Sequence, residues 1–139
     1  MLEIPTTYFP QPGPKNTARV LNEINPHFVR SMPFVPRANT PMYEAYQKGE
    51  FELTSPHERL QEIRLMVETL QVTSRVCFDH NLNPSYRAGN RLVPLLKQDY
   101  GGYKFPEEKT TVLELIDKGL RLDETAFIHV KDLVGATNL

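Results

Sequence analysis

The chain has 139 residues, 16 of them basic and 17 acidic, and its net charge of -1 gives no electrostatic basis for binding nucleic acid or an anionic membrane. Its single cysteine excludes an intrachain disulfide, and no apolar run reaches the ~18 residues that a membrane-spanning helix needs. The first residues also lack the basic and apolar regions of a signal peptide, so we expect a cytoplasmic protein without nucleic-acid or membrane partners.

The N-terminal segment, residues 1–14, is predicted to be an irregular arm because it holds four prolines and shows no hydrophobic periodicity. Residues 15–139 are long enough to form a single α/β domain. At the start of this domain, apolar residues recur at helical spacing as far as Ile24. Asn25-Pro26 should end this helix, since the residue before a proline is disfavoured in the α region.

A short buried strand is predicted over residues 28–32, which are mostly apolar, as in a strand covered on both faces. Arg30 lies in this strand, and Arg37 lies in the loop that leaves its carboxyl end. Parallel α/β folds bind ligands at that edge of the sheet, so both arginines are candidate ligand contacts. The alternative is that they are solvated surface residues. The strand also needs an edge neighbour, either the N-terminal arm or another chain.

Two helix starts follow the strand. Thr40-Pro41 offers a hydroxyl N-cap with proline in the first turn, and Gly49 should end this helix. Ser55 and Glu58 have the spacing of a capping box, with proline at the first helical position. This second helix is predicted to bury Leu60, Ile63, Met66, Val67 and Leu70 and to expose Glu58, Arg59, Glu62 and Arg64.

The second half of the chain is predicted to contain one more strand and one more long helix. Residues 72–78 are rich in β-branched side chains and alternate in polarity, which indicates the strand. The helix should begin at Pro106 and end near Lys118-Gly119. Residues 124–134 form a weakly helical C-terminal extension.

Asp79 and His80 stand directly after the second predicted strand, where α/β proteins place catalytic groups. A histidine with a pKa near ~6.5 is suited to proton transfer, so the two residues are candidate catalytic groups. The alternative is structural: Asp79 caps or braces the loop and His80 hydrogen-bonds to a backbone carbonyl, because Asp and Asn are common in turns.

A further candidate is a basic and aromatic segment that includes Arg87, Arg91 and the run Tyr100 to Tyr103. Such a segment can clasp an anionic or planar ligand, and Asn83 and Arg87 are candidate substrate contacts. Its glycines are equally typical of a flexible surface turn. No metal site is predicted, because Cys77 and the histidines lack the spacing of metal ligands.

Several short runs, taken together, resemble a known family. They are LNEINPHFVR, a Thr-Pro-x-Tyr helix start, FELTSP, FDHNLN and GYKFPEEK, and they occur in order between about residues 16 and 122. This order resembles the C-terminal part of a radical S-adenosylmethionine (SAM) protein, from the family of Fe-S oxidoreductases of unknown substrate. The family's loop usually has glycine before Thr-Pro, whereas this chain has Asn39, which tolerates a positive φ better than most residues.

The resemblance implies an α/β fold, namely the C-terminal fragment of a partial (β/α)6 radical SAM barrel with a helical extension. It implies that residues 28–31 and Pro36-Arg37 line the adenosine end of S-adenosyl-L-methionine. The family binds a [4Fe-4S] cluster with a CxxxCxxC motif, and this chain has only Cys77, which cannot supply the thiolates. We therefore expect no cofactor on the chain alone.

Two interpretations remain at this stage. In the first, the chain is the C-terminal portion of a radical SAM enzyme, inactive alone, which pairs with a cluster-bearing N-terminal half or with another copy of itself. In the second, it is a non-catalytic interaction or assembly module that docks onto a separate cluster-bearing protein. A hydrolase is not supported, because no nucleophile, base and oxyanion site come together in the sequence.

Overall fold

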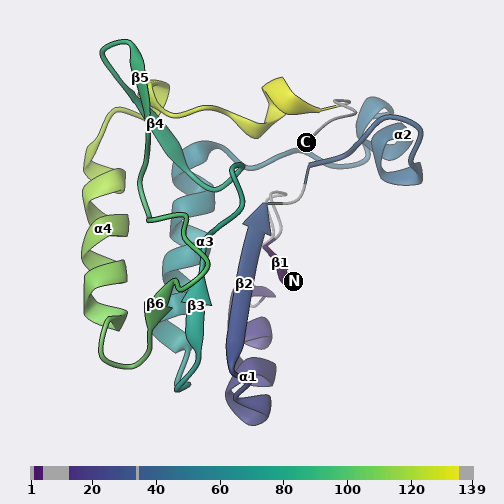
Figure 1. The fold of residues 1–139 in the computed structure, drawn as a ribbon. Helices are drawn as coiled ribbons and strands as arrows, with labels where there is room; N and C mark the ends of the chain where they lie inside the picture. Colours follow the sequence, from purple (N-terminus) through teal and green to yellow (C-terminus); the bar gives the residue numbers. More distant parts are fainter. Residues whose placement is uncertain (1, 5–12, 34, 135–139) are drawn as a thin grey trace.

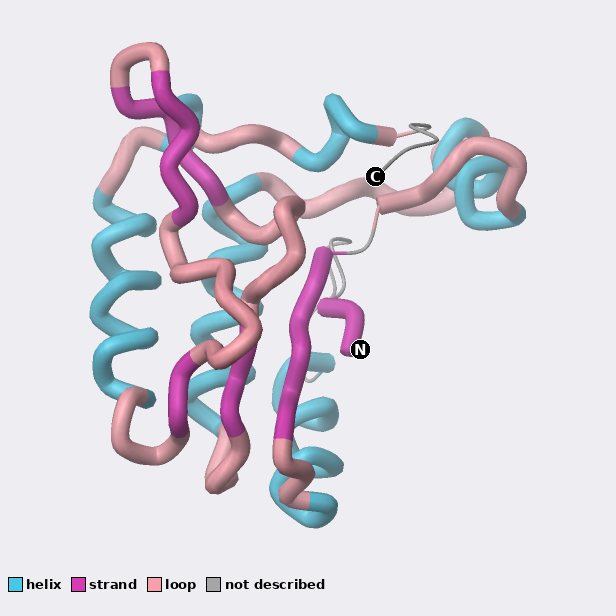
Figure 2. Tube along the Cα trace, viewed as in Figure 1, coloured by secondary structure: helices cyan, strands magenta, loops and turns pink. Residues whose placement is uncertain are grey.

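The computed structural model describes residues 2–4, 13–33 and 35–134, and it shows an α/β arrangement (Figure 1, Figure 2). Within these ranges the sheets are open and no barrel closes. In chain order the elements are β1 (Leu2–Ile4), α1 (Gly13–Ile24), β2 (Phe28–Pro33), α2 (Pro41–Gln47), α3 (Pro56–Thr69), β3 (Arg75–Cys77), β4 (Ser85–Ala88), β5 (Arg91–Pro94), β6 (Tyr103–Lys104), α4 (Lys109–Arg121), and the 3-10 turns η1 (Glu124–Ala126) and η2 (Val130–Leu133).

The main sheet has the strand order β1-β2-β3-β6. β2 runs parallel to both β1 and β3, whereas β6 is antiparallel to β3. Strands β4 and β5 form a separate antiparallel hairpin. The two parallel pairings place the carboxyl ends of β2 and β3 at one edge of the sheet, which is the edge where the sequence predicts ligand contacts.

Helices α1 and α3 lie behind the sheet in Figure 1, and α3 packs between α1 and α4. Residues of β2 are buried alternately, so Val29 faces the helices while Phe28 and Arg30 project from the opposite face. Val76 of β3 joins the core on the helix side. The sheet therefore has one face packed on helices and one that carries polar and aromatic side chains.

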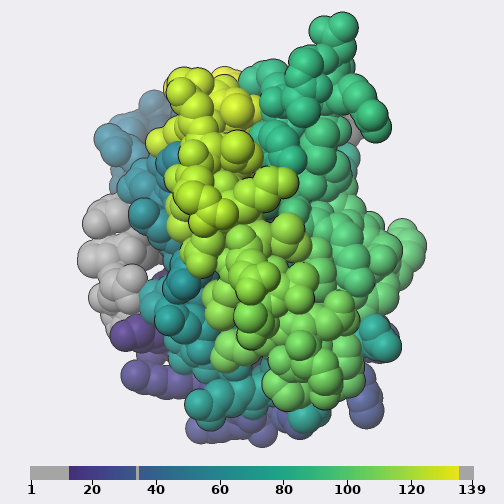
Figure 3. All heavy atoms as spheres, turned by 90° about the vertical axis from the view of Figure 1, so that its left-hand side faces the viewer, coloured from purple at the N-terminus to yellow at the C-terminus, as the bar shows by residue number. Residues whose placement is uncertain are grey.

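The view in Figure 3 shows the side of the molecule that α4 covers. Helix α4 and the segment after it form a continuous surface there, and the β4–β5 hairpin projects beyond it. Tyr86 of this hairpin contacts Phe127 with ring centroids 5.9 Å apart, so the C-terminal segment holds the hairpin in place. No helix in the described ranges has the length and apolar character to span a membrane.

The helix starts predicted from capping residues are confirmed. Thr40 caps α2, and its hydroxyl accepts from the Tyr43 amide at 3.2 Å. Asn39, just before it, has a φ of 64°, a conformation that asparagine adopts more readily than most residues. The helix before β2 ends at Ile24, followed by Asn25-Pro26, also as predicted.

Ser55 forms the complete capping box of α3. Its hydroxyl accepts from the Glu58 amide at 3.2 Å, and the Glu58 carboxylate accepts from the Ser55 amide at 3.0 Å. The same hydroxyl bonds to Glu124, which is the main reason that the pKa of the Glu124 carboxyl lies below its usual value. The cap thus stabilises α3 and also fixes the C-terminal segment on its first turn.

Replacing this cap tests its contribution. Ser55→Ala removes the acceptor for the Glu58 amide and is expected to lower the free energy of unfolding by about 0.5–2 kcal/mol. Ser55→Thr keeps a hydroxyl and serves as the control, with a loss near the low end of that range or less. Urea unfolding measures both, and equal midpoints for Ser55→Ala and the unchanged protein would show that the cap is not stabilising.

Other boundaries differ from the sequence predictions. β3 covers only residues 75–77 of the predicted 72–78, and α4 begins at Lys109 rather than Pro106, because a turn over 105–108 precedes it. The prediction that Gly119 ends this helix is wrong, since α4 continues to Arg121. A Cβ at Gly119 would lie 2.5 Å from the Leu95 side chain, so this glycine lets α4 pack closely against Leu95.

The N-terminal arm and the hairpin were also incompletely predicted. Leu2–Ile4 form a strand that pairs with residues 31–33 of β2, so the arm supplies the edge neighbour that β2 needs. Gly13-Pro14 already belong to α1, and residues 5–12 lie outside the described ranges. The β4–β5 hairpin was missed although its Gly89-Asn90 turn between alternating strands is a recognised signal.

Candidate functional site

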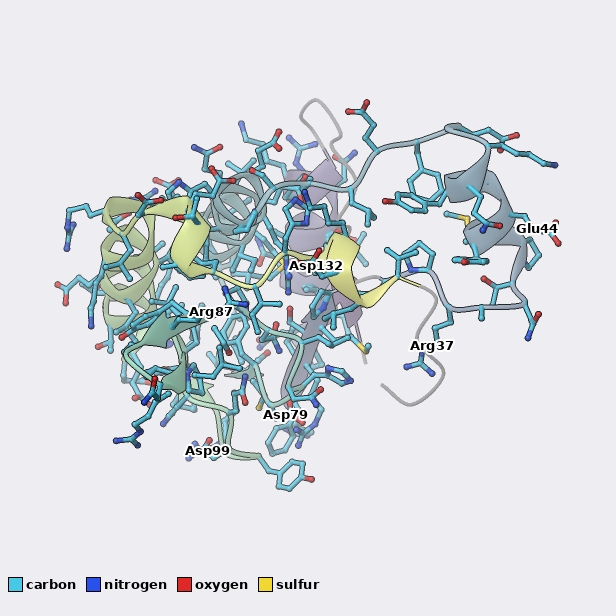
Figure 4. The ribbon with its side chains drawn as sticks, turned by 90° about the horizontal axis from the view of Figure 1, so that it is seen from above. Arg37, Glu44, Asp79, Arg87, Asp99 and Asp132 are labelled. Carbon is cyan, nitrogen blue, oxygen red and sulfur yellow. The ribbon has the colours of Figure 1, made fainter. Side chains whose placement is uncertain are left out.

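The carboxyl ends of β2 and β3 bring two predicted site residues together. Arg30 pairs in register with Cys77, and Asp79 follows β3 by two residues. The Arg30 Nη1 lies 3.1 Å from the Asp79 Oδ2, with Arg30 30% exposed and Asp79 10% exposed. Figure 4 looks down on this end of the sheet and places Asp79 there. The expectation that Asp79 and Arg30 share one rim is confirmed for this pair.

The Arg30 guanidinium is held between two aromatic rings. Its Cζ lies 5.4 Å from the centroid of Phe28 and 5.5 Å from that of Tyr100. Its Nη2 donates to the Tyr100 carbonyl at 3.4 Å. These contacts fix the plane of the guanidinium and leave its position little freedom, as a site that orients a ligand requires.

The ion pair is not saturated with hydrogen bonds. The Arg30 Nη1 and the Asp79 Oδ1 are both buried, and neither has a hydrogen-bond partner among the described residues. The pair at 3.1 Å is thus a charge contact without good hydrogen-bond geometry. Unpaired buried polar atoms cost free energy, so both atoms keep unused hydrogen-bonding capacity: Arg30 as a donor and Asp79 as an acceptor.

Cys77 lies beneath this pair on the same face of the sheet. It is fully buried, and its Sγ donates to the Tyr100 carbonyl at 3.4 Å. Burial raises the pKa of the thiol, with Arg30 partly opposing the rise and Asp79 adding to it. The thiol is therefore protonated at neutral pH and has the character of a packed structural residue.

The buried thiol predicts a specific reactivity and pH dependence. The native protein should react with Ellman's reagent far more slowly than the urea-unfolded protein. Because the thiol pKa is higher in the folded state, its stabilising effect is present below the unfolded-state pKa of ~8.5 and is lost as the pH rises through the folded-state value. Cys77→Ala should reduce this alkaline loss. Equal thiol reactivity in the native and unfolded protein would contradict the burial.

His80 and Asn83 build the turn after β3. The His80 Nδ1 accepts from the Leu82 amide at 3.1 Å, and its carbonyl accepts from the Asn83 amide at 3.0 Å. Asn83 is buried and donates through Nδ2 to the Ser31 carbonyl of β2 at 2.9 Å. His80 thus bonds to the backbone, as in the structural alternative, but its ring accepts from an amide and does not donate to the predicted carbonyl. Asn83 braces two strand ends.

The other two predicted contacts lie apart from the pair. Arg37 is exposed in the loop that leads to α2, and Arg87 is exposed on β4. In Figure 4 the labelled side chains of Arg37, Asp79 and Arg87 are spread across the view and do not converge. The clasp predicted from Arg87, Arg91 and the Tyr100 run is also divided, since the arginines lie on the β4–β5 hairpin while Tyr100 lies beside Arg30.

Arg59 is a buried charge that the sequence analysis placed on the exposed face of α3. It is 4% exposed, and burial lowers the pKa of its guanidinium to about 9, with Glu62 opposing the shift. Its Nη2 donates to the Leu82 carbonyl at 3.0 Å. Arg59 was missed because the helical pattern cannot show that the 79–83 turn covers the first turn of α3.

The described residues contain no group of three or more His, Cys, Asp or Glu side chains arranged to hold a metal ion. Comparison with protein-family profiles gives no match, and neither the curated proteins nor the solved structures provide a similar chain. The fold class, α/β, therefore comes from the structure, and a function can be argued only from the Arg30–Asp79 rim and the sequence motifs.

Proposed function

We propose that this chain is the C-terminal portion of a radical SAM Fe-S oxidoreductase, in which it closes the barrel and contacts the cofactor or substrate. Strands β1, β2 and β3 support this proposal because they are parallel neighbours in chain order. Helices α1 and α3 lie on one face of that sheet, as in a segment of a (β/α) barrel. The proposed location is the cytoplasm.

Arg30 is the residue that carries the proposal. Its guanidinium lies at the carboxyl end of β2, fixed by Phe28 and Tyr100 and with an unbonded Nη1 beside Asp79. A carboxylate is the natural ligand of such a guanidinium, and S-adenosyl-L-methionine carries one together with an ammonium group that suits Asp79. The chemistry of the bound cofactor is reductive cleavage to a 5′-deoxyadenosyl radical.

The cluster itself does not fit this chain. A [4Fe-4S] cluster needs several thiolates, and the chain offers only Cys77, which is buried with a raised pKa. In the proposal a cluster-bearing N-terminal half supplies the CxxxCxxC ligands. The chain's own residues then bind and orient: Arg30 holds the carboxylate, Asp79 takes the ammonium, and Asn83 keeps the two strand ends together.

Anaerobic reconstitution of the isolated chain tests whether the cluster has to come from another polypeptide segment. With iron, sulfide, a reductant and S-adenosyl-L-methionine, we expect no stoichiometric cluster and no 5′-deoxyadenosine. A charge-transfer absorption band accompanied by 5′-deoxyadenosine would overturn the proposal. The DNA directly upstream provides a second check, since the proposal expects a reading frame with CxxxCxxC there.

A non-catalytic assembly module is the second candidate. It is favoured by α2, which projects from the rest of the chain and has no buried residue. An exposed arm of this kind is typical of a segment that packs on a partner. Co-purification with a tagged cluster-bearing partner separates the two functions. The assembly module would be favoured if partner binding is kept in Arg30→Gln but lost when residues 41–47 are deleted. Neither change should then affect catalysis by the partner.

A further inference from the structure

A row of three side chains crosses the sheet at the end opposite the Arg30–Asp79 rim. Phe28 of β2 pairs in register with Arg75 of β3, and Arg75 pairs in register with Lys104 of β6. Side chains of directly paired residues project from the same face of a sheet. The row therefore presents one aromatic ring and two positive charges side by side, on the face that the helices do not cover.

The same three residues line a cavity of about 320 Å³, with Asn25, Pro26, His27 and Thr73 completing its wall. This volume lies within the range of small-ligand sites, ~300–1,000 Å³. Phe28 is 49% exposed although it is a large aromatic residue, and the Arg30 guanidinium lies 5.4 Å from its ring centroid. The other ring face is suited to a second planar group.

The two cations occupy an unfavourable arrangement without a ligand. Like charges directly opposite each other in an antiparallel pair are destabilising, and Arg75 and Lys104 are such a pair. Neighbouring groups satisfy the Lys104 ammonium more fully than the Arg75 guanidinium. Arg75 gives its Nη1 to the Gly101 carbonyl at 3.3 Å, and Lys104 bonds to the Thr73 and Phe105 carbonyls and lies 3.8 Å from the mostly exposed Glu107. An anion between them would remove the repulsion.

We infer that this cavity binds a nucleoside monophosphate, with its phosphate between Arg75 and Lys104 and its base against the ring of Phe28. A guanidinium and an ammonium are the usual partners of phosphate, and a base stacks on an aromatic ring regardless of its identity. The site lies at the amino ends of β2 and β3 and shares Phe28 with the surroundings of Arg30, but it does not depend on the function proposed for the Arg30–Asp79 rim.

Isothermal titration with AMP tests the site, with adenosine and inorganic phosphate as partial ligands. We expect saturable AMP binding that is at least about tenfold tighter than that of either partial ligand, since each supplies only half of the contacts. Arg75→Gln should weaken AMP binding about tenfold or more, and Phe28→Leu should weaken AMP binding without changing that of phosphate. Arg87→Gln removes another exposed arginine, on β4 outside the cavity, and should leave AMP binding unchanged.

Thermal unfolding of each variant shows whether its fold is kept, and Arg75→Gln should retain it because the side chain is exposed. Three results would overturn the inference. The first is that AMP does not bind saturably up to about 10 mM. The second is that Arg75→Gln, while folded, binds AMP as the unchanged protein does. The third is that Arg87→Gln weakens AMP binding as much as Arg75→Gln does. The third result would show that the affinity for AMP depends only on the net charge of the protein.

Discussion

Gly102→Ala is expected to destabilise the protein by about 2–5 kcal/mol, combining overpacking with the strain of a left-handed backbone. Gly102 has a φ of 60°, and a Cβ there would lie 2.4 Å from the Val76 carbonyl oxygen and 2.6 Å from the Cys77 Sγ. Both are parts of β3 that cannot move without disturbing the sheet. The loop that holds Tyr100 over Arg30 would shift, so the Arg30 site should be lost together with the stability.

Gly89→Ala is the matched control. Gly89 has nearly the same φ, 62°, but a Cβ there would have nothing within 4 Å. Gly89→Ala should therefore lower the free energy of unfolding only by the cost of backbone strain, about 1–2 kcal/mol. Chemical unfolding of the two variants therefore separates the close approach from the strain. Equal losses at Gly89 and Gly102 would mean that the loop does not pack on β3 as the structure shows.

Phe78→Ala is expected to lower the free energy of unfolding by about 3–5 kcal/mol, because it leaves a cavity in the core. Phe78 is fully buried, packs edge-on against Tyr103, and directly precedes Asp79. Small domains have a total stability of only about 5–15 kcal/mol, so the variant should lose a large fraction of its stability. Calorimetry or urea unfolding measures the loss.

Leu92→Ala provides the control for this substitution. Leu92 is 52% exposed on β5, so its truncation should change the stability by no more than about 0.5 kcal/mol. A loss at Phe78 as small as that at Leu92 would contradict the packing of the segment that joins β3 to Asp79.

Local sequence signals predicted those parts of the fold that local chemistry determines. Ser55 with Glu58, Thr40 with Pro41, and Asn25-Pro26 each mark a boundary through bonds within a few residues, and each boundary is found in the structure. The N-terminal arm was predicted as one possible edge neighbour of β2, but the strand β1 itself was missed because three residues are too few for a pattern. Gly119 was misread as a helix end because only its packing on Leu95 explains it.

The site was predictable to the extent that parallel topology determines it. The carboxyl ends of parallel strands gather at one edge of a sheet, and this rule alone predicts that Arg30 and Asp79 lie close together, as they do. The sequence did not show that Tyr100, far along the chain, completes the surroundings of Arg30, because the loop reaches β3 only in the folded state. Nor did it show that Arg59 is buried under the 79–83 turn.

The central claim is that Arg30 orients the cofactor of a radical SAM enzyme, and 5′-deoxyadenosine formation measures it most directly. For this test the chain is produced together with a cluster-bearing half of the kind that the proposal requires, reconstituted anaerobically and supplied with S-adenosyl-L-methionine. We predict product from the combined protein, and a loss of about tenfold or more for Arg30→Gln but not for Arg87→Gln when both variants remain folded. Absence of product from a combined protein that carries its cluster, or equal product from the Arg30→Gln variant, would contradict the account.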